Sequence, residues 1–423
     1  MTEVPVTKPS GSFWTENIPA DWTEPNLRYV ASIRNGSDYK EFQVEDGGYP
    51  VIGSGGVFAR TSKYLHDGES VLLGRKGTVD KPLYVNGRFW TVDTMFYTNI
   101  DRRVVAKFLH YFATTIPFDY FQTSTAVPSM TQGDLGSIKV PLPELERQQE
   151  IVDFLDRETA QIDDLISKQE RLIELLDKKR QAIITHAVTK GLDPTALTKP
   201  SGIPWLGDIP AHWTASQLGT WLIHKIEGGY SPTASGIFPE EEDWGVLSLG
   251  AVGRGEFLPD KVKAVDPSAE VPTTLEIRDG DLLLTRSNVR ERVGFAAVVE
   301  GARPKTIFPD LVYRLGVNSS MDKQYLAWFL SSTPARAQIE SSARGSSGTM
   351  PKISHDQIRA WRIPLPPLRE QQELVAFVRS ECSRIDNVSV SASNAIGLLQ
   401  ERRSALISAA VSGRIDVRER AQS

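Results

Sequence analysis

Two long stretches of the chain carry apolar residues at steps of three, four or seven, the pattern of helices that pair along a narrow seam. Residues 144–190 contain neither glycine nor proline, whereas Gly397 weakens the second helix, which follows Pro366. A helix of roughly 40 residues would be about 60 Å long. The predicted seam residues are Leu155, Ile162, Leu165, Leu172, Leu176, Ile183, Ile385, Val388, Leu399 and Leu406.

The two helical stretches are copies of each other. "PLPELERQQEIVDFL" begins at Pro141 and "PLPPLREQQELVAFV" begins at Pro364, and this offset of 223 holds without a gap over some fifty positions. A second pair opens each half: "KPSGSFWTENIPADWT" at Lys8 is similar to "KPSGIPWLGDIPAHWT" at Lys199, at an offset of 191. The chain is therefore a duplication whose two middle parts have diverged.

Either helix alone would expose a long apolar seam, and the obvious partner is its own duplicate. A duplicated unit has a pseudo-two-fold axis, and an axis perpendicular to the helices makes them antiparallel. We therefore predict an antiparallel coiled coil. The alternative is a pair of ordinary surface helices, each packed on its own globular body.

The diverged middle parts, residues 27–139 and 218–362, contain short β-like runs separated by Gly, Asp and Asn, and each ends in a modest helix. The predicted class is α+β, with two mixed α/β domains joined by the two long helices. The predicted boundaries are 1–140 for the first domain, 141–193 for the central helix, 194–362 for the second domain and 363–423 for the C-terminal helix.

One motif is still recognisable in both middle parts: "HDGESVLLGRKG" is similar to "RDGDLLLTRSN". Each predicts a turn, a buried strand and then a basic, polar loop. Arginine and asparagine are well shaped to contact guanine and adenine edges, although basic side chains at strand ends are usually just solvated. The candidate DNA-binding residues are Arg75, Lys76, Arg286, Asn288, Arg290 and Arg292.

Composition and motifs exclude several classes of protein. The net charge of −5 argues against a protein that coats nucleic acid by bulk charge, and Cys382 is the only cysteine. We find no phosphate-binding loop, nucleophile elbow or paired histidines, so we predict no catalytic residues and no metal site. The stretch "GSGGVF" at Gly53 predicts a turn, because no helix follows it. With no predicted signal peptide or membrane helix, the expected compartment is the cytoplasm.

Four tryptophans recur at fixed spacing in the openings of both halves. They could stack on bases, but the shared spacing favours packing that fastens each middle part to the helix ends. They are Trp14, Trp22, Trp205 and Trp213.

Taken together, the chain resembles the specificity (S) subunits of type I restriction–modification enzymes. The resemblance covers nearly the whole sequence and is most specific in Pro-Leu-Pro-x-Leu-x-x-Gln-Gln-Glu, which occurs twice, and in the paired Ile-Pro-x-x-Trp openings. It implies that each middle part is a target recognition domain for one half of a bipartite DNA sequence. It also implies that the coiled coil sets the distance between the two half-sites, and that the subunit has no catalysis of its own.

The resemblance further implies that the partners are double-stranded DNA, methyltransferase subunits that use S-adenosylmethionine, and an ATP-dependent restriction subunit that translocates and cuts. S-adenosylmethionine, ATP and Mg²⁺ would then be bound by those subunits and not by this chain. The competing hypothesis is a coiled-coil scaffold whose two lobes bind proteins. Such a scaffold would leave no sequence-dependent footprint on DNA.

Overall fold

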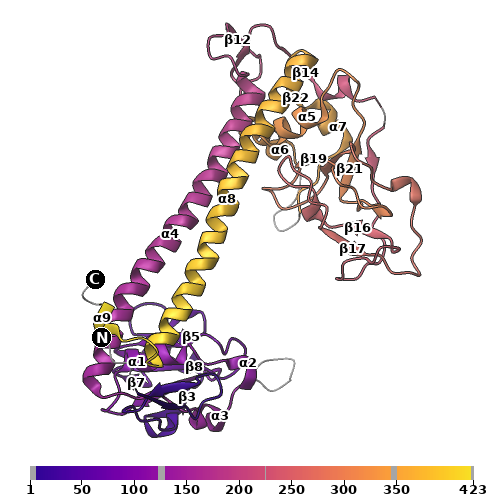
Figure 1. The fold of residues 1–423 in the computed structure, drawn as a ribbon. Helices are drawn as coiled ribbons and strands as arrows, with labels where there is room; N and C mark the ends of the chain where they lie inside the picture. Colours follow the sequence, from indigo (N-terminus) through magenta and orange to yellow (C-terminus); the bar gives the residue numbers. More distant parts are fainter. Residues whose placement is uncertain (1–5, 122–128, 224, 344–349, 421–423) are drawn as a thin grey trace. The chain divides into compact units, whose positions relative to one another are not determined.

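The computed structural model describes residues 6–121, 129–223, 225–343 and 350–420. The chain divides into two compact units: the first contains Met1–Arg171 and Ala392–Ser423, and the second contains Leu172–Ser391. Two long helices, α4 (Leu145–Lys190) and α8 (Leu368–Val411), contribute to both units (Figure 1).

The first unit holds two main sheets with strand orders β4-β6-β5-β10-β7 and β3-β11-β8-β9. Its strands are β1 (Thr7–Pro9), β2 (Asn17–Pro19), β3 (Ala31–Asn35), β4 (Gln43–Val44), β5 (Tyr49–Gly53), β6 (Gly56–Thr61), β7 (His66–Asp67), β8 (Ser70–Gly74), β9 (Leu83–Val85), β10 (Arg88–Thr91) and β11 (Met95–Ile100). Its short helices are η1 (Leu27–Tyr29), η2 (Lys40–Phe42), α1 (Ala106–Ala113), α2 (Phe118–Phe121), α3 (Gln132–Ser137) and α9 (Val417–Arg420).

The core of the first unit joins the sheet to both long helices. All five residues of β8 are buried, as expected for a continuous apolar strand in the middle of a domain. Phe108 and Phe112 of α1 pack in one apolar cluster with Leu155 of α4 and Ile407 of α8. The first domain and its ends of α4 and α8 therefore form a single hydrophobic core.

The second unit has the same kind of architecture, with sheets ordered β15-β21-β18-β19 and β17-β16-β20. Its strands are β12 (Thr198–Pro200), β13 (Asp208–Pro210), β14 (Thr214–Gln217), β15 (Glu227–Gly228), β16 (Gly245–Leu247), β17 (Val262–Ala264), β18 (Leu282–Thr285), β19 (Ala296–Val298), β20 (Thr306–Ile307), β21 (Val312–Leu315) and β22 (Arg362–Leu365). Its short helices are η3 (Leu218–Trp221), η4 (Leu249–Ala251), η5 (Thr273–Leu275), α5 (Lys323–Ser331), α6 (Thr333–Ser342) and α7 (His355–Ala360).

In the second unit the buried strand is β18, and α5 plays the part that α1 plays in the first. Tyr325 of α5 is fully buried, and its hydroxyl donates to the carbonyl of Pro364 at 2.9 Å and to that of Val188, on α4, at 3.2 Å. Val378 of α8 belongs to the same core. Each unit therefore packs a mixed α/β domain against one end of the helix pair.

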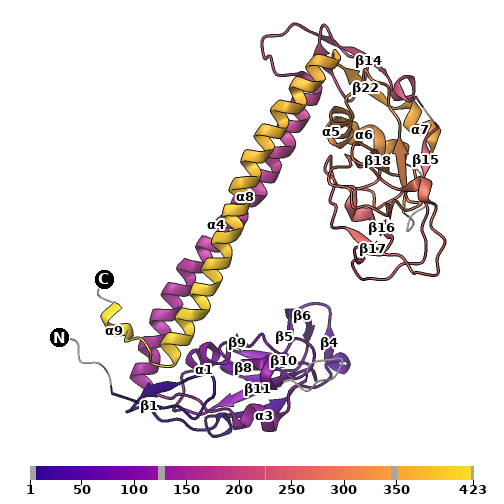
Figure 2. The same cartoon turned by 45° about the vertical axis from the view of Figure 1, so that its right-hand side comes forward.

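The two long helices are antiparallel, as an ion pair in each unit shows. In the first unit Arg403 donates to Asp163 at 2.9 and 3.3 Å, and in the second unit Arg180 donates to Asp386. Both arginines and both aspartates are related by the offset of 223. Because Asp163 precedes Arg180 on α4 whereas their partners occur in the reverse order on α8, the helices run in opposite directions, side by side in both views (Figures 1 and 2). The predicted α+β class with two paired antiparallel helices is confirmed.

The heptad seam differs from the prediction at three positions. Leu165, Leu172 and Val388 are 45%, 37% and 45% exposed, so they lie outside the seam. The next residues along the chain, including Ile166 and Ile173, are the less exposed ones. The three predicted positions lie one residue too early, because apolar residues also occupy the exposed positions directly before the seam residues.

The corrected seam has the same register in both helices. The seam of α4 follows a row of buried or half-buried positions: Leu155, Thr159, Ile162, Ile166, Gln169, Ile173, Leu176, Arg180 and Ile183. Their equivalents on α8 are Val378, Cys382, Ile385, Ser389, Ala392, Ile396, Leu399, Arg403 and Leu406. Each α8 position is its α4 counterpart plus 223. Steps of four and three alternate along most of both rows, which is the spacing of a coiled coil.

A glycine after each long helix packs against a buried tryptophan from the opening motif. Gly191 and Gly413 have φ values of +76° and +73°, and Trp213 and Trp22 are 0% and 3% exposed. A Cβ atom on Gly413 would lie 2.5 Å from Pro19, so only glycine fits. Trp22 and Trp213 thus pack at the helix ends, as the sequence predicts.

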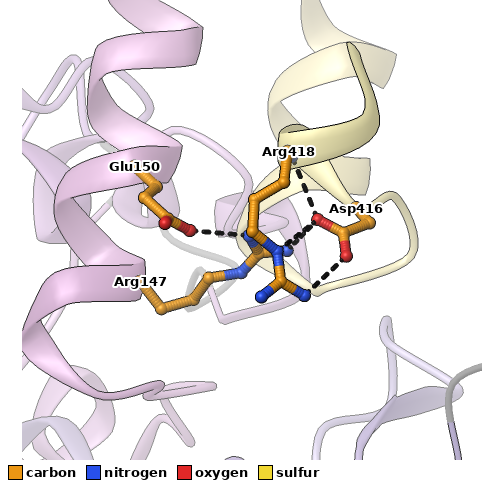
Figure 3. Close-up of polar contacts among 4 residues, drawn as sticks. All are labelled: Arg147, Glu150, Asp416 and Arg418. Carbon is orange, nitrogen blue, oxygen red and sulfur yellow. Dashed lines mark hydrogen bonds and ion pairs between the residues drawn. The ribbon is translucent and has the colours of Figure 1, made fainter. Parts of the chain in front are cut away.

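The segment after α8 is fastened to the first turns of α4 (Figure 3). Arg147 of α4 donates to Asp416 at 2.7 Å and to Glu150 at 2.8 Å, and Arg418 donates to Asp416 at 2.8 Å. These hydrogen bonds, Arg418 first and then Arg147, hold the pKa of the Asp416 carboxyl well below its ordinary value.

We expect Asp416→Asn to lower the free energy of unfolding of the first unit by about 1 kcal/mol at neutral pH, because a partly buried ion pair is lost. A carboxyl whose pKa is depressed by folding stabilises above its unfolded pKa of about 3.9, and the benefit disappears as the pH falls towards its folded pKa. Denaturant unfolding of both proteins should therefore show a difference that narrows below about pH 4. A difference that is constant with pH would contradict this role of the carboxylate.

Candidate nucleic-acid interface

Each unit places an arginine over an aromatic ring at the end of its buried strand. Arg75 follows β8, and its guanidinium carbon lies 5.9 Å from the ring centre of Phe96 on β11. Arg286 follows β18 and lies 5.5 Å from the ring centre of Tyr313 on β21. In both units these two strands are antiparallel neighbours, so the arginine leaves one strand and lies over the ring of the next.

A later segment fixes each arginine loop in the same way. The amide of Met130 donates to the carbonyl of Arg75 at 2.9 Å, and that of Ile353 donates to the carbonyl of Arg286 at 3.0 Å. In both units the very next residue caps a short helix: Thr131 caps α3 and Ser354 caps α7, each with a reciprocal capping box. The arrangement is therefore a conserved feature of the duplicated fold within this chain, although the side chains around it differ.

Around Arg286 the side chains form an open, polar hollow lined also by Tyr313, Lys352 and His355. His355 lies edge-on to Tyr313, with 4.7 Å between ring centres. Burial, helped by the positive charge of Arg286, lowers the pKa of His355 below its ordinary value, which favours the neutral imidazole. Arg286 and Lys352 are cations, and the neutral form of the His355 ring can both donate and accept a hydrogen bond. Together they suit a ligand that presents both phosphates and base edges.

The loop that follows Arg286 is held rigidly from behind by α6. Arg336 is only 7% exposed and donates to the carbonyls of Val293 at 2.6 Å and Arg290 at 3.1 Å. The hydroxyl of Thr285 donates to the carbonyl of Arg292 at 2.8 Å. The side chains of Arg290 and Arg292 are exposed on this loop, as a DNA contact requires.

Asn288 lies differently from the other predicted residues. It is 8% exposed, and its Oδ1 accepts a hydrogen bond from the amide of Val289 at 2.8 Å. In this position the short amide side chain stabilises the turn of its own loop, and its contact with DNA stays a prediction.

In the first unit Lys76 is exposed and Arg75 is half-buried, with its Nη1 donating to the carbonyl of Asp93 at 3.1 Å. Two further polar residues lie at this edge: Gln132 donates to Asn35 at 3.1 Å, and Asn35 is opposite Phe96 in the β3–β11 pair. The sequence contains no local signal for them, because four separate segments meet here.

A second pair of missed residues connects each domain to its long helix. Gln148 donates to the carbonyls of Pro143 and Arg103, each at 2.9 Å, and accepts from the amide of Val105 at 2.8 Å. Gln371, its duplicate, makes the corresponding bonds in the second unit, to Pro366, Ser320 and Asp322. Both glutamines are fully buried. The sequence shows that Gln-Gln-Glu is repeated, but it does not show that the first glutamine of each copy bonds the domain.

Over the part of the chain that the structure describes, no group of His, Cys, Asp and Glu is arranged to hold a metal ion. Within the same residues, no helix is long and apolar enough to cross a membrane.

Known proteins with similar sequences and structures share this architecture. A family model described as the type I restriction modification DNA specificity domain matches residues 19–175. The chain is 25% identical over 290 residues to the type I restriction enzyme EcoKI specificity subunit from Escherichia coli strain K12, covering 67% of this chain and 59% of that protein. It is 21% identical over 427 residues to the EcoDI specificity subunit from Escherichia coli, covering 96% of this chain and 91% of that one.

The chain spans only part of the length of several relatives. It covers 59% of the EcoKI subunit and 35% of the EcoEI specificity subunit from Escherichia coli. It covers 54% of a putative type I restriction enzyme specificity subunit, MjaX, from Methanocaldococcus jannaschii. Among solved structures, a chain from a study of complex assembly in a type I restriction–modification system has a TM-score of 0.66 at 16% identity. The match covers 94% of this chain and 99% of that one. The fold is shared.

Proposed function

Since the chain belongs to the family of type I restriction–modification specificity subunits, we propose that it is the sequence-specific DNA-binding subunit of such a complex and is itself non-catalytic. In this proposal each variable domain recognises one half of a bipartite target, and the coiled coil sets the spacer. The observation that carries it is the arginine over an aromatic ring, Arg75 on Phe96 and Arg286 on Tyr313, at the equivalent strand end of two otherwise diverged domains.

The proposed domains keep the boundaries predicted above: target recognition domains at 1–140 and 194–362, and conserved helices at 141–193 and 363–423. Within the domains, the proposed DNA contacts are Arg75 and Lys76 in the first, and Arg286, Arg290 and Arg292 in the second. The exposed cations Lys76, Arg290 and Arg292 are suited to phosphates, and the two ring-stacked arginines to base edges.

The proposed partners are double-stranded DNA, methyltransferase subunits with S-adenosylmethionine, and a restriction subunit with ATP and Mg²⁺, all in the cytoplasm. A chain with a net charge of −5 binds DNA weakly by bulk charge, so the methyltransferase subunits would supply much of the phosphate contact. The same face of the DNA groove recurs only about every 10–10.5 base pairs. Two domains that each recognise a half-site therefore need a fixed separation, which a pair of long helices can provide.

The function is tested by methylation-site sequencing of a host with and without this gene. We expect one asymmetric, two-part motif that is methylated only when the gene is present. A single contiguous motif would contradict the two-domain proposal. An unchanged methylation pattern, together with no sequence-dependent footprint by the purified complex, would instead favour the protein-binding scaffold.

We expect Arg286→Ala to weaken binding to the motif about 10- to 100-fold and to relax recognition of one half-site only, since a bidentate base contact discriminates by about 1–3 kcal/mol. Arg75→Ala is the matched variant in the first domain and should relax the other half-site. Selection of bound sequences from a random pool by each assembled complex measures both effects. Equal loss at both half-sites in either variant would indicate misfolding or a general phosphate contact.

A further inference from the structure

The hairpin of β5 and β6 ends at the same edge of the first unit as Arg75. Strand β5 is parallel to β10, with Ile52 opposite Thr91. The C-terminal ends of the two strands are therefore neighbours, and Gly53 lies beside the turn that follows β10. Arg75 is bonded to that turn: its amide donates to the carbonyl of Thr94 at 2.9 Å. The hairpin tip is therefore continuous with the proposed DNA-binding edge.

The tip is apolar and projects from the domain. Val57 and Phe58 are 61% and 56% exposed, although they are large hydrophobic side chains. A Cβ atom added to Gly55 or Gly56 would have no neighbour within 4 Å, so nothing packs against the turn.

The ring of Phe58 is nevertheless held in place. It lies over Gly53, where a Cβ atom would come within 3.2 Å of it, and edge-on to Tyr39 with 5.5 Å between ring centres. The missing side chain at Gly53 thus lets the ring pack close to the hairpin backbone. A positioned aromatic ring loses little conformational freedom when it binds a ligand.

The second unit has no free tip in the corresponding place. The connection between β16 and β17 folds back onto the domain: the amide of Gly255 donates to the carbonyl of Ala296 at 3.0 Å, and Gln324 donates to the carbonyl of Gly255 at 2.9 Å. A Cβ atom on Gly255 would lie 2.4 Å from Trp328. The β16–β17 connection is therefore held against its own domain, unlike the tip of the β5–β6 hairpin.

We propose that the tip formed by Val57 and Phe58 is an apolar contact of the first domain with double-stranded DNA, beside the cationic contact made by Arg75 and Lys76. This inference rests on the proposed function and adds a specificity element to one half-site. The position of the hairpin favours DNA as the occupant: it turns at the strand ends next to the Asp93–Thr94 turn, to which the cationic Arg75 is bonded. Thymine methyl groups and base faces are the apolar surfaces that a duplex offers such a side chain.

An apolar contact has a distinct experimental signature. It displaces no counterions, so its loss lowers affinity without changing the dependence of binding on salt, whereas the loss of one phosphate contact reduces the slope of log K against log salt by about one. We expect Phe58→Ala to weaken binding about tenfold with an unchanged slope, and Lys76→Ala to weaken binding with a smaller slope.

The experiment measures binding of the full chain, assembled with its methyltransferase subunits, to the duplex identified by methylation-site sequencing, at several salt concentrations. Tyr29→Ala is the matched control: Tyr29 is a 63% exposed aromatic residue of the same unit, but it precedes Ala31, at the opposite end of β3 from Asn35. We expect it to bind like the wild type. Thermal unfolding of each variant should be unchanged, because both rings are exposed.

Equal affinities for Phe58→Ala and Tyr29→Ala would overturn the hairpin contact, while sequence-specific binding by the wild type would leave the proposed function intact. Loss of methyltransferase subunits from purified Phe58→Ala, with normal DNA affinity of the complex that remains, would also overturn it, in favour of a protein partner. An absence of sequence-dependent binding by the wild type would refute the proposed function together with this inference.

Discussion

Gln148→Leu is expected to lower the free energy of unfolding of the first unit by about 3 kcal/mol, the largest loss of stability that we predict. The side chain is fully buried and satisfies two carbonyls and one amide. Leucine has a similar size but no polar atom, so it would leave these backbone groups buried without partners, at a cost of about 1–3 kcal/mol each before relaxation.

The neighbouring residue provides the control. Gln149 is exposed and donates only to Asp153, at 2.8 Å, so Gln149→Leu should change stability by less than about 0.5 kcal/mol. The duplicated positions repeat the comparison, with Gln371→Leu destabilising the second unit and Gln372→Leu not. Denaturant unfolding followed by tryptophan fluorescence distinguishes the variants. Similar stabilities for Gln148→Leu and Gln149→Leu would show that water can replace the buried bonds.

The buried glutamines illustrate what a repeat can and cannot reveal. The sequence shows that Gln148 and Gln371 are duplicated within a helical stretch. It does not show that they face the domain and not the solvent, because two of the three backbone groups that each glutamine bonds lie in a loop more than forty residues earlier in the sequence. Long-range polar contacts of this kind leave no local pattern.

The helix pairing was predictable because the heptad period and the pseudo-two-fold axis follow directly from the aligned residues. The exact seam positions were less predictable. Leu165 and Val388, which are equivalent in the two helices, are predicted seam residues, but both are exposed. Apolar residues at adjacent positions, such as Leu165 and Ile166, leave the phase of a seam undetermined. The ion pairs of Arg180 and Arg403 fix that phase in the structure.

At the candidate interface the sequence located the strand ends but not the neighbouring side chains. Arg75 and Arg286 were identified from the shared motif, whereas the rings beneath them come from strands more than twenty residues further on. The turn-stabilising bond of Asn288 could not be predicted, because a short amide after a strand is equally suited to a DNA contact and to a turn of its own loop. The exposed Val57 and Phe58 could be predicted only as part of a turn.

Removal of seven residues from each long helix, Leu165–Arg171 and Val388–Asn394, is expected to shorten the spacer of the DNA target by about three base pairs. Seven residues are one heptad, which corresponds to about 10 Å of helix, and one base pair is about 3.4 Å long. Both ion pairs, Asp163 with Arg403 and Arg180 with Asp386, lie outside the deleted segments and keep their register. Removal of equal lengths from both helices leaves the antiparallel pairing intact.

Methylation-site sequencing of a host that carries the deletion variant would give the new spacer directly, with both half-sites expected to be unchanged. A deletion of five residues from each helix is the matched control, because it rotates each seam away from its partner and should abolish methylation, not change the spacer. An active seven-residue variant that retains the original spacer would show that the paired helices do not measure the distance between half-sites. Partner subunits would then have to set that distance, because the two ion pairs would still hold the helices of the specificity chain in register.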